Sequence, residues 1–239
     1  MYILKIIAYF MRNFIKKQSV IIMFVGVILV LSACYSKIVE ISVSKFNGIT
    51  IVIDAGHGGR DGGCVGVNGT IEKEINLEYA LRLKEKLVDN GYRVVLTRKN
   101  DDGLYSPLAK NKKQSDMNAR LQVIKQANPN LVISIHMNSF PSASAQGANT
   151  FYREGDRASK DCADLIQKSI STYCNAKNIK SKEGDYFLLN CSYYTAVLIE
   201  CGFISNETEE AMLNSAEYKT RFTDAVYNGI LLYFGNAKI

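Results

Sequence analysis

Several features that mark common protein classes are scarce or missing in this 239-residue sequence. It has no internal repeat and no low-complexity stretch, and only three of its residues are proline. The composition is otherwise ordinary for a globular protein, with 47% hydrophobic and 22% charged residues. The length therefore indicates one domain of about 200 residues with its own hydrophobic core, plus an appendage.

Basic tracts interleaved with aromatic residues are also missing, and such tracts are typical of nucleic-acid surfaces. The net charge of +6 misleads, because four basic residues and no acidic residue lie within residues 1–35. Without those four, 25 basic residues face 23 acidic ones, so the rest of the chain is nearly neutral. We therefore expect no nucleic-acid partner.

The cysteines form neither a C-x-x-C pair nor the spacing of a zinc ribbon. A domain of this size needs no disulfide framework to be stable. We expect most of the thiols to be buried and to pack as small hydrophobic groups. The six are Cys34, Cys64, Cys162, Cys174, Cys191 and Cys201.

A long hydrophobic run near the N-terminus is typical of a targeting segment. Lys16 and Lys17 precede an uncharged stretch over residues 18–36, and positive charge before an apolar run is the export pattern. The run ends in Leu31-Ser-Ala-Cys34, which resembles a bacterial lipoprotein cleavage box. An uncleaved membrane anchor, lipidation at Cys34 and ordinary cleavage all remain open, with a buried core helix as the alternative. Each targeting interpretation places the residues after about 40 on the extracytoplasmic face of the cell membrane.

Strands and helices alternate in the remainder of the chain, residues 41–239. Short apolar runs predict strands over residues 49–54, 93–97, 131–135, 150–152, 186–189 and 196–200. Helical periodicity predicts helices over residues 72–90, 116–126 (capped by Ser115), 160–173, 208–213 and 216–234. We therefore predict a single α/β domain with a mainly parallel, twisted sheet and helices on both faces. Residues 1–40 form the preceding export or anchor segment and linker.

Histidine is scarce, and its two occurrences are placed alike. His57 and His136 each follow a predicted strand, Glu200 closes another, and Glu72 opens the first long helix. Parallel strands bring their carboxyl ends to one edge of a sheet, where these side chains can converge. Two imidazoles and a carboxylate are a common ligand set of hydrolytic zinc, and a further carboxylate takes the proton from water. Ordinary polar loop residues, and an acid favoured at a helix start, are the alternative interpretation.

The glycine-rich segment after the first strand lacks the features of a nucleotide-binding loop. Asp61 occupies the third glycine position of G-x-G-x-x-G counted from Gly56 and Gly58, and a Walker lysine is missing. Glycine also allows the backbone to pass close to a metal or a substrate. We expect that second role here.

Four segments together resemble the motifs of the zinc-dependent type 3 N-acetylmuramoyl-L-alanine amidases. They occur in the family's order, at residues 51–63, 71–77, 134–139 and 197–206, and Leu96-Thr-Arg98 fits a lesser block. Ala55 and Thr195 replace prolines that are common in the family. The resemblance implies a role for each matching residue. His57, Glu72 and His136 bind one Zn²⁺, Glu200 is the catalytic general base, Asp54 orients a histidine ligand, and Asn138 helps to hold substrate.

The resemblance also implies the reaction and its setting. The amide bond between N-acetylmuramic acid and the L-alanine of the stem peptide would be hydrolysed in peptidoglycan. A compact catalytic domain behind a membrane signal is similar to the sporulation cortex amidases of spore-forming bacteria, which work in the intermembrane space of the forespore. Some relatives need an activating partner protein. The alternatives are a non-catalytic wall-binding or scaffolding protein on the same fold, or another zinc hydrolase of the wall, such as a peptidase or a deacetylase.

Overall fold

The computed structural model describes residues 11, 23–32, 35, 46–175, 180–190 and 193–236. The chain divides into two units, Met1–Phe46 and Asn47–Ile239. In the first unit, residues 23–32 are helical and exposed. Within the described ranges, no helix is long and apolar enough to cross a membrane. Cys34, the residue lipidated in one of the open targeting alternatives, lies outside the described residues.

The second unit is built on one sheet. Its described residues contribute six strands: β1 (Thr50–Ala55), β2 (Arg93–Leu96), β3 (Leu131–Asn138), β4 (Asn149–Tyr152), β5 (Lys182–Glu183) and β6 (Ala196–Phe203). The strand order is β2-β1-β3-β6-β4-β5. Neighbouring strands run parallel except β4 and β6, which are antiparallel. The sheet is therefore mixed, with one antiparallel pair that the sequence pattern did not predict.

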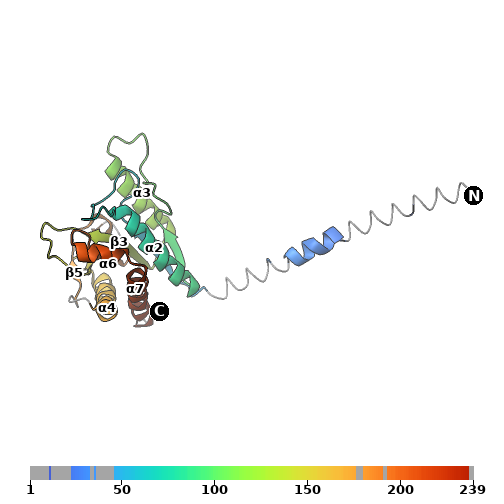
Figure 1. The fold of residues 1–239 in the computed structure, drawn as a ribbon. Helices are drawn as coiled ribbons and strands as arrows, with labels where there is room; N and C mark the ends of the chain where they lie inside the picture. Colours follow the sequence, from blue (N-terminus) through green and yellow to red (C-terminus); the bar gives the residue numbers. More distant parts are fainter. Residues whose placement is uncertain are drawn as a thin grey trace, which may run out of the picture. The chain divides into compact units, whose positions relative to one another are not determined.

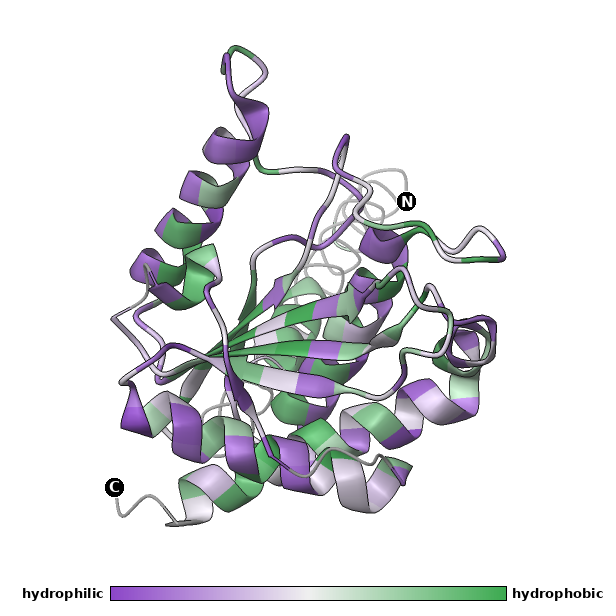
Figure 2. Ribbon diagram, turned by 90° about the vertical axis from the view of Figure 1, so that its left-hand side faces the viewer, coloured by the Kyte–Doolittle hydropathy of each residue, from purple (hydrophilic) through white to green (hydrophobic). Residues whose placement is uncertain are grey.

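Helices flank the sheet and make the unit a single α/β domain (Figure 1). The helices are α2 (Glu72–Asp89), α3 (Lys112–Ala127), α4 (Arg157–Cys174), α5 (Phe187–Asn190), α6 (Glu207–Asn214) and α7 (Ala216–Asn236). Helices α2 and α4 pack against the sheet and against α7, whereas α3 and α5 contact each other and the sheet. Figure 2 shows the apolar strands at the centre of the domain, with hydrophilic residues on the outer sides of the helices.

Side chains that alternate along the strands fill two hydrophobic cores. Ile51 and Ile53 of β1 belong to the core shared with α2, α4 and α7, and Val52 between them belongs to the core under α3 and α5. All three are fully buried. Strands covered on both faces are apolar at every position, which is why β1 was recognisable in the sequence.

Two predicted elements differ from the structure. The helix expected from Asp116 begins at Lys112, because the side chain of Asn111, rather than Ser115, accepts the hydrogen bond from the Gln114 amide that caps it. The strand predicted over residues 186–189 is wrong, because residues 187–189 belong to the short helix α5. An apolar run of four residues fits a buried helical turn as well as a strand.

Strands β3 and β6 are longer than predicted. They continue to Asn138 and Phe203, so His136 and Glu200 lie within strands rather than at their ends. Polar side chains at the end of each strand ended the apolar run in the sequence, although the backbone pairing goes on.

The cysteines divide into two groups. Cys162 and Cys201 are buried thiols, as expected, whereas Cys174 is half-buried and Cys64 is exposed. These four are free thiols, and Cys34 and Cys191 lie outside the described residues.

Candidate active site

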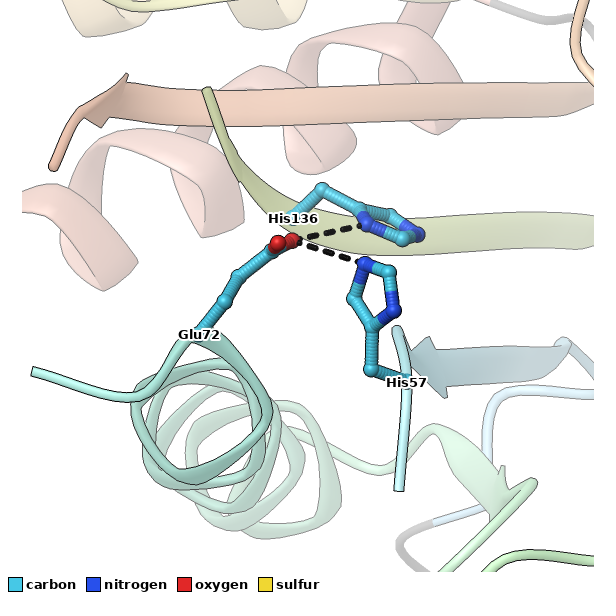
Figure 3. A group of neighbouring side chains, drawn as sticks. All are labelled: His57, Glu72 and His136. Carbon is cyan, nitrogen blue, oxygen red and sulfur yellow. Dashed lines mark hydrogen bonds and ion pairs between the residues drawn. The ribbon is translucent and has the colours of Figure 1, made fainter. Parts of the chain in front are cut away.

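Three polar side chains from distant parts of the chain meet at the carboxyl edge of the sheet. His57 follows β1, Glu72 is the first residue of α2, and His136 lies near the end of β3. Figure 3 shows the Glu72 carboxylate facing both imidazole rings. Its Oε1 atom lies 3.1 Å from His57 Nε2 and 3.0 Å from His136 Nδ1. One ligand atom from each residue lies within 4.8 Å of the other two, so the three residues can share one metal ion.

Glu72 is held in place by hydrogen bonds to both carboxylate oxygens. Oε2 accepts from the Cys64 amide, and Oε1 accepts from the Met137 amide and the Asn76 side chain. The carboxylate is only 2% exposed. Burial alone would raise the pKa of Glu72, but hydrogen bonds and charge interactions with the two histidines outweigh burial and lower it strongly. These contacts therefore favour the ionised form of Glu72.

His57 adopts a backbone conformation that is uncommon for a residue with a side chain. Its φ angle is +63°, in the left-handed region. The ring presents Nε2 to Glu72, and its Nδ1 lies 3.0 Å from Asp61 Oδ1. Burial lowers the pKa of His57, but Glu72 and Asp61 together raise it above its usual value.

Glycines leave the space that the three side chains occupy. A Cβ atom at Gly56 would lie 2.2–2.6 Å from ring atoms of His136. A Cβ atom at Gly63 would lie 2.4 Å from Glu72 Oε2 and 2.8 Å from His57 Cδ2. These distances are too short for any side chain, so the glycine-rich segment has the role expected for it, a close approach of backbone to the site.

Two buried arginines hold the turn that carries His57. Arg98 donates hydrogen bonds to the carbonyl oxygens of Ala55 and Gly56, and Arg120 donates to those of Ala55 and His57. The side chain of Arg120 is 2% exposed. In the sequence, the only signal for Arg98 is a weak one, its place in the lesser block Leu96-Thr-Arg98. No signal marks Arg120, because an arginine in the middle of a helix is ordinary.

Asp54 balances the buried charge of Arg120. Its carboxylate accepts hydrogen bonds from Arg120, Thr97 and Ser134, each at 2.7 Å. Burial would raise the pKa of Asp54, but Arg120 and the two hydroxyl groups lower it to about 2. We expected Asp54 to orient a histidine ligand directly. Among the described residues, however, no histidine ring donates a hydrogen bond to its carboxylate. Asp54 instead acts on His57 through Arg120, which joins the aspartate to the His57 carbonyl.

Glu200 lies beside His136 in a different environment from Glu72. The two residues are register partners on the adjacent parallel strands β3 and β6. Glu200 is 9% exposed, and its Oε2 atom has no hydrogen-bond partner among the described residues. Burial raises the pKa of Glu200 to about 7, and the charge of Glu72 adds to the rise. A carboxyl group with a pKa near neutrality is suited to accept and return a proton.

Asn138 lies two residues beyond His136, after an irregularity in the pairing of β3 with β6. It is half-buried, and its Oδ1 atom accepts a hydrogen bond from the Ser139 amide. The structure thus brings four of the six expected residues together through direct contacts or strand pairing, namely His57, Glu72, His136 and Glu200. Asp54 is joined to His57 only through Arg120, and Asn138 is partly exposed near the end of β3.

The fold and the site together define an α/β domain with a candidate metal centre at the carboxyl edge of its sheet. The chain belongs to the N-acetylmuramoyl-L-alanine amidase family, which matches residues 51–231. The resemblance noted in the sequence is therefore confirmed. The activity is that of a peptidoglycan amidase, hydrolysis of the amide bond between N-acetylmuramic acid and L-alanine.

Individual relatives agree with the family. The chain is 34% identical to the germination-specific N-acetylmuramoyl-L-alanine amidase of Bacillus subtilis over 79% of its own length and 81% of that protein. It superposes on the CwlD amidase of Clostridioides difficile, solved in complex with the GerS lipoprotein. That match has a TM-score of 0.75 and 35% identity, over 78% of this chain and 98% of CwlD. The catalytic domain of CwlV from Bacillus (Paenibacillus) polymyxa matches with a TM-score of 0.69 and 31% identity, over 78% and 98% of the two chains.

The space beside Glu72 gives a first prediction. Replacing Gly63 by alanine places a methyl group against the Glu72 carboxylate and His57, so we expect the affinity of this candidate metal site for added Zn²⁺ to fall about tenfold or more. Gly69→Ala is the matched control, because its φ of +89° is similarly unfavourable for alanine but a Cβ there meets nothing within 4 Å. Competition with a fluorescent zinc chelator measures both affinities. Equal affinities for the two variants would contradict the prediction.

The depressed pKa of Asp54 gives a second prediction, on stability. A carboxylate with a pKa of about 2 in the folded state stabilises the fold above its unfolded pKa of about 4. That contribution, roughly 2 kcal/mol, is lost as the pH falls from about 4 to about 2. Asp54→Asn is therefore expected to unfold more easily at pH 7 and to lose less stability between pH 4 and pH 2. Urea denaturation in excess chelator measures this, and parallel pH profiles for wild type and variant would count against it.

Proposed function

We propose that the domain hydrolyses its amide bond with one Zn²⁺ held by His57, Glu72 and His136. The observation that carries the proposal is the approach of one ligand atom from each residue to within 4.8 Å of the others. The donor set also fits the ion, because two imidazoles and one carboxylate are typical of hydrolytic zinc sites. Glu72 supplies a fixed negative charge. The nearby glycines have no side chain, so the space that the three residues occupy stays open.

Glu200 is proposed as the group that moves the proton. When bound, zinc supplies the Lewis acidity that makes water nucleophilic near neutral pH. Glu200 then accepts the proton of the attacking water on its unpartnered oxygen and delivers it to the amine of L-alanine as the carbon–nitrogen bond breaks. Glu200 pairs with His136 across the sheet, so its carboxylate stays next to the proposed ligands. Burial raises its pKa to about 7, where the group can both accept and release a proton near neutral pH.

The remaining residues are proposed to position rather than to react. Asp54 fixes Arg120, and Arg120 with Arg98 fixes the turn that presents His57. Asn138 is proposed to contact substrate, since it is partly exposed at the end of the strand that carries His136.

We further propose that the enzyme acts on peptidoglycan during spore cortex maturation. A germination-specific amidase and the CwlD amidase are among its relatives, and CwlD was solved with a lipoprotein partner. An activating partner protein is therefore proposed here as well. The charged and apolar pattern of residues 16–36 supports work at the extracytoplasmic face of the cell membrane, in the intermembrane space of the forespore.

The roles of Glu200 and His136 can be separated by two variants. Glu200→Gln keeps the shape of the side chain but cannot accept a proton, so it should bind zinc stoichiometrically and lose activity by several orders of magnitude. His136→Ala should lose both zinc and activity, because a ligand is missing. Metal analysis by mass spectrometry and a muropeptide assay measure both properties. Substantial turnover by zinc-loaded Glu200→Gln protein, or tight stoichiometric zinc in His136→Ala protein, would refute the corresponding role.

Digestion of purified peptidoglycan tests the reaction itself. We expect intact stem peptides and peptide-free glycan as products, release that stops with chelator, and recovery when zinc is restored. A deacetylase would release acetate, a peptidase would cut within the stem peptide, and a non-catalytic wall-binding protein would release nothing while still binding the wall. Mass spectrometry of the soluble products distinguishes these outcomes.

A further inference from the structure

A cavity of about 300 Å³ opens directly beside the two histidines. It lies on the side of the sheet covered by α3 and α5, and both His57 and His136 contribute to its wall. Part of the wall is apolar, formed by Met117, Tyr186, Phe187, Leu188 and Leu198. A molecule bound in the cavity would therefore touch two of the three candidate metal ligands, His57 and His136, together with these apolar side chains, whereas Glu72 and Glu200 are not part of the wall.

The charged groups of the cavity are mostly engaged with one another. Asp54 and Asp116 both pair with Arg120, and Asp61 lies 3.0 Å from His57. Asp185 and Lys113 also line the cavity, are exposed, and form no ion pair within the described part of the chain. The Asp185 carboxylate accepts a hydrogen bond from the Asn190 side chain, and the charge of Lys113 acts on Asp61. Lys113 is thus the exposed cation of this wall.

Lys113 is also well placed on its helix. With Asp116, Met117 and Arg120 it forms the i, i+3, i+4, i+7 face of α3, and all four residues line the cavity. It belongs to the first turn of the 16-residue helix, where the free amide groups and the helix dipole also favour an anion. The lysine charge and the helix end thus act in the same direction.

We propose that this cavity binds the stem peptide and that Lys113 recognises the free α-carboxylate of its second residue, D-isoglutamate. The inference rests on the proposed function and names the part of the substrate that this wall contacts. The glycan near the scissile bond offers no negative charge once the lactyl carboxyl group is in amide linkage. The D-isoglutamate carboxylate is the first anion on the peptide side, one residue beyond the bond that is cut. The apolar wall accommodates the methyl group of L-alanine between the metal centre and Lys113.

The proposal makes the enzyme sensitive to amidation of the peptide. Stem peptides with D-isoglutamine have the same shape as those with D-isoglutamate but lack the charge. An ion pair at an exposed site corresponds to about a two- to fivefold preference in kcat/KM for the acidic form. Because solvent reaches Lys113, added salt should reduce that preference.

The test uses full-length, zinc-loaded protein and two synthetic muramoyl peptides that differ only in D-isoglutamate or D-isoglutamine. Wild type and Lys113→Arg are expected to prefer the acidic peptide about two- to fivefold, whereas Lys113→Met should cleave both with similar kcat/KM. Lys110→Met is the matched control, because it removes the same charge from a nearby residue outside the cavity wall and should keep the preference.

The possible outcomes distinguish failure of the proposed role of Lys113 from failure of the proposed function. Equal cleavage of both peptides by wild type, or an unchanged preference in Lys113→Met, would overturn the role of Lys113 while leaving the amidase function intact. A lost preference in Lys110→Met would also overturn it, because the effect would then be one of general charge. Failure of wild type to cleave either peptide would overturn the proposed function itself, and the role of Lys113 with it.

Discussion

The turn from Ala55 to His57 is held by hydrogen bonds from two buried guanidinium groups, and the geometry of the site depends on these bonds. Three consecutive carbonyl groups would otherwise lie inside the domain with few donors, and buried acceptors without partners are strongly destabilising. Arg98 and Arg120 satisfy them together. Arg120 is itself tolerated inside the domain because Asp54 and Asp116 flank it. The same contacts keep His57 in a left-handed conformation that costs on the order of 1–3 kcal/mol, so the imidazole is aimed before any ion binds.

The two glutamates at the site illustrate how different surroundings suit the same functional group to the different roles proposed for them. Glu72 is surrounded by amide and imidazole donors, which hold it in its ionised form. Glu200 is nearly as well buried, yet one of its oxygens has no partner among the described residues, and its pKa rises to about 7. A group that must bind a cation needs a fixed charge, whereas a group that exchanges protons needs a pKa near that of its medium.

Most of the fold and the gathering of His57, Glu72 and His136 at one edge of the sheet were predictable from the sequence, for physical reasons that also explain the failures. Buried parallel strands such as β1 leave continuous apolar runs, and scarce histidines after such runs are easy to find. Residues 186–189 were misassigned because four apolar residues fit either a strand or a helical turn. The contribution of Arg120 was invisible, because nothing in a helical sequence tells a buried arginine from a solvated one. The expected contact of Asp54 with a histidine failed for the same reason, since that prediction could not include the arginine between them.

The pairing of β3 with β6 has a consequence for how such enzymes diversify. His136 and Glu200 are directly opposite each other in a parallel ladder, so their backbones are separated by the ordinary strand spacing of about 4.8 Å. That separation is set by main-chain hydrogen bonds deep in the sheet and not by the connecting segments around the rim. Loops such as residues 99–111 and 139–148 can therefore lengthen, shorten or change composition without altering the reactive geometry. Evolution can in this way redirect the enzyme to new cell-wall chemistries by remodelling its surface alone.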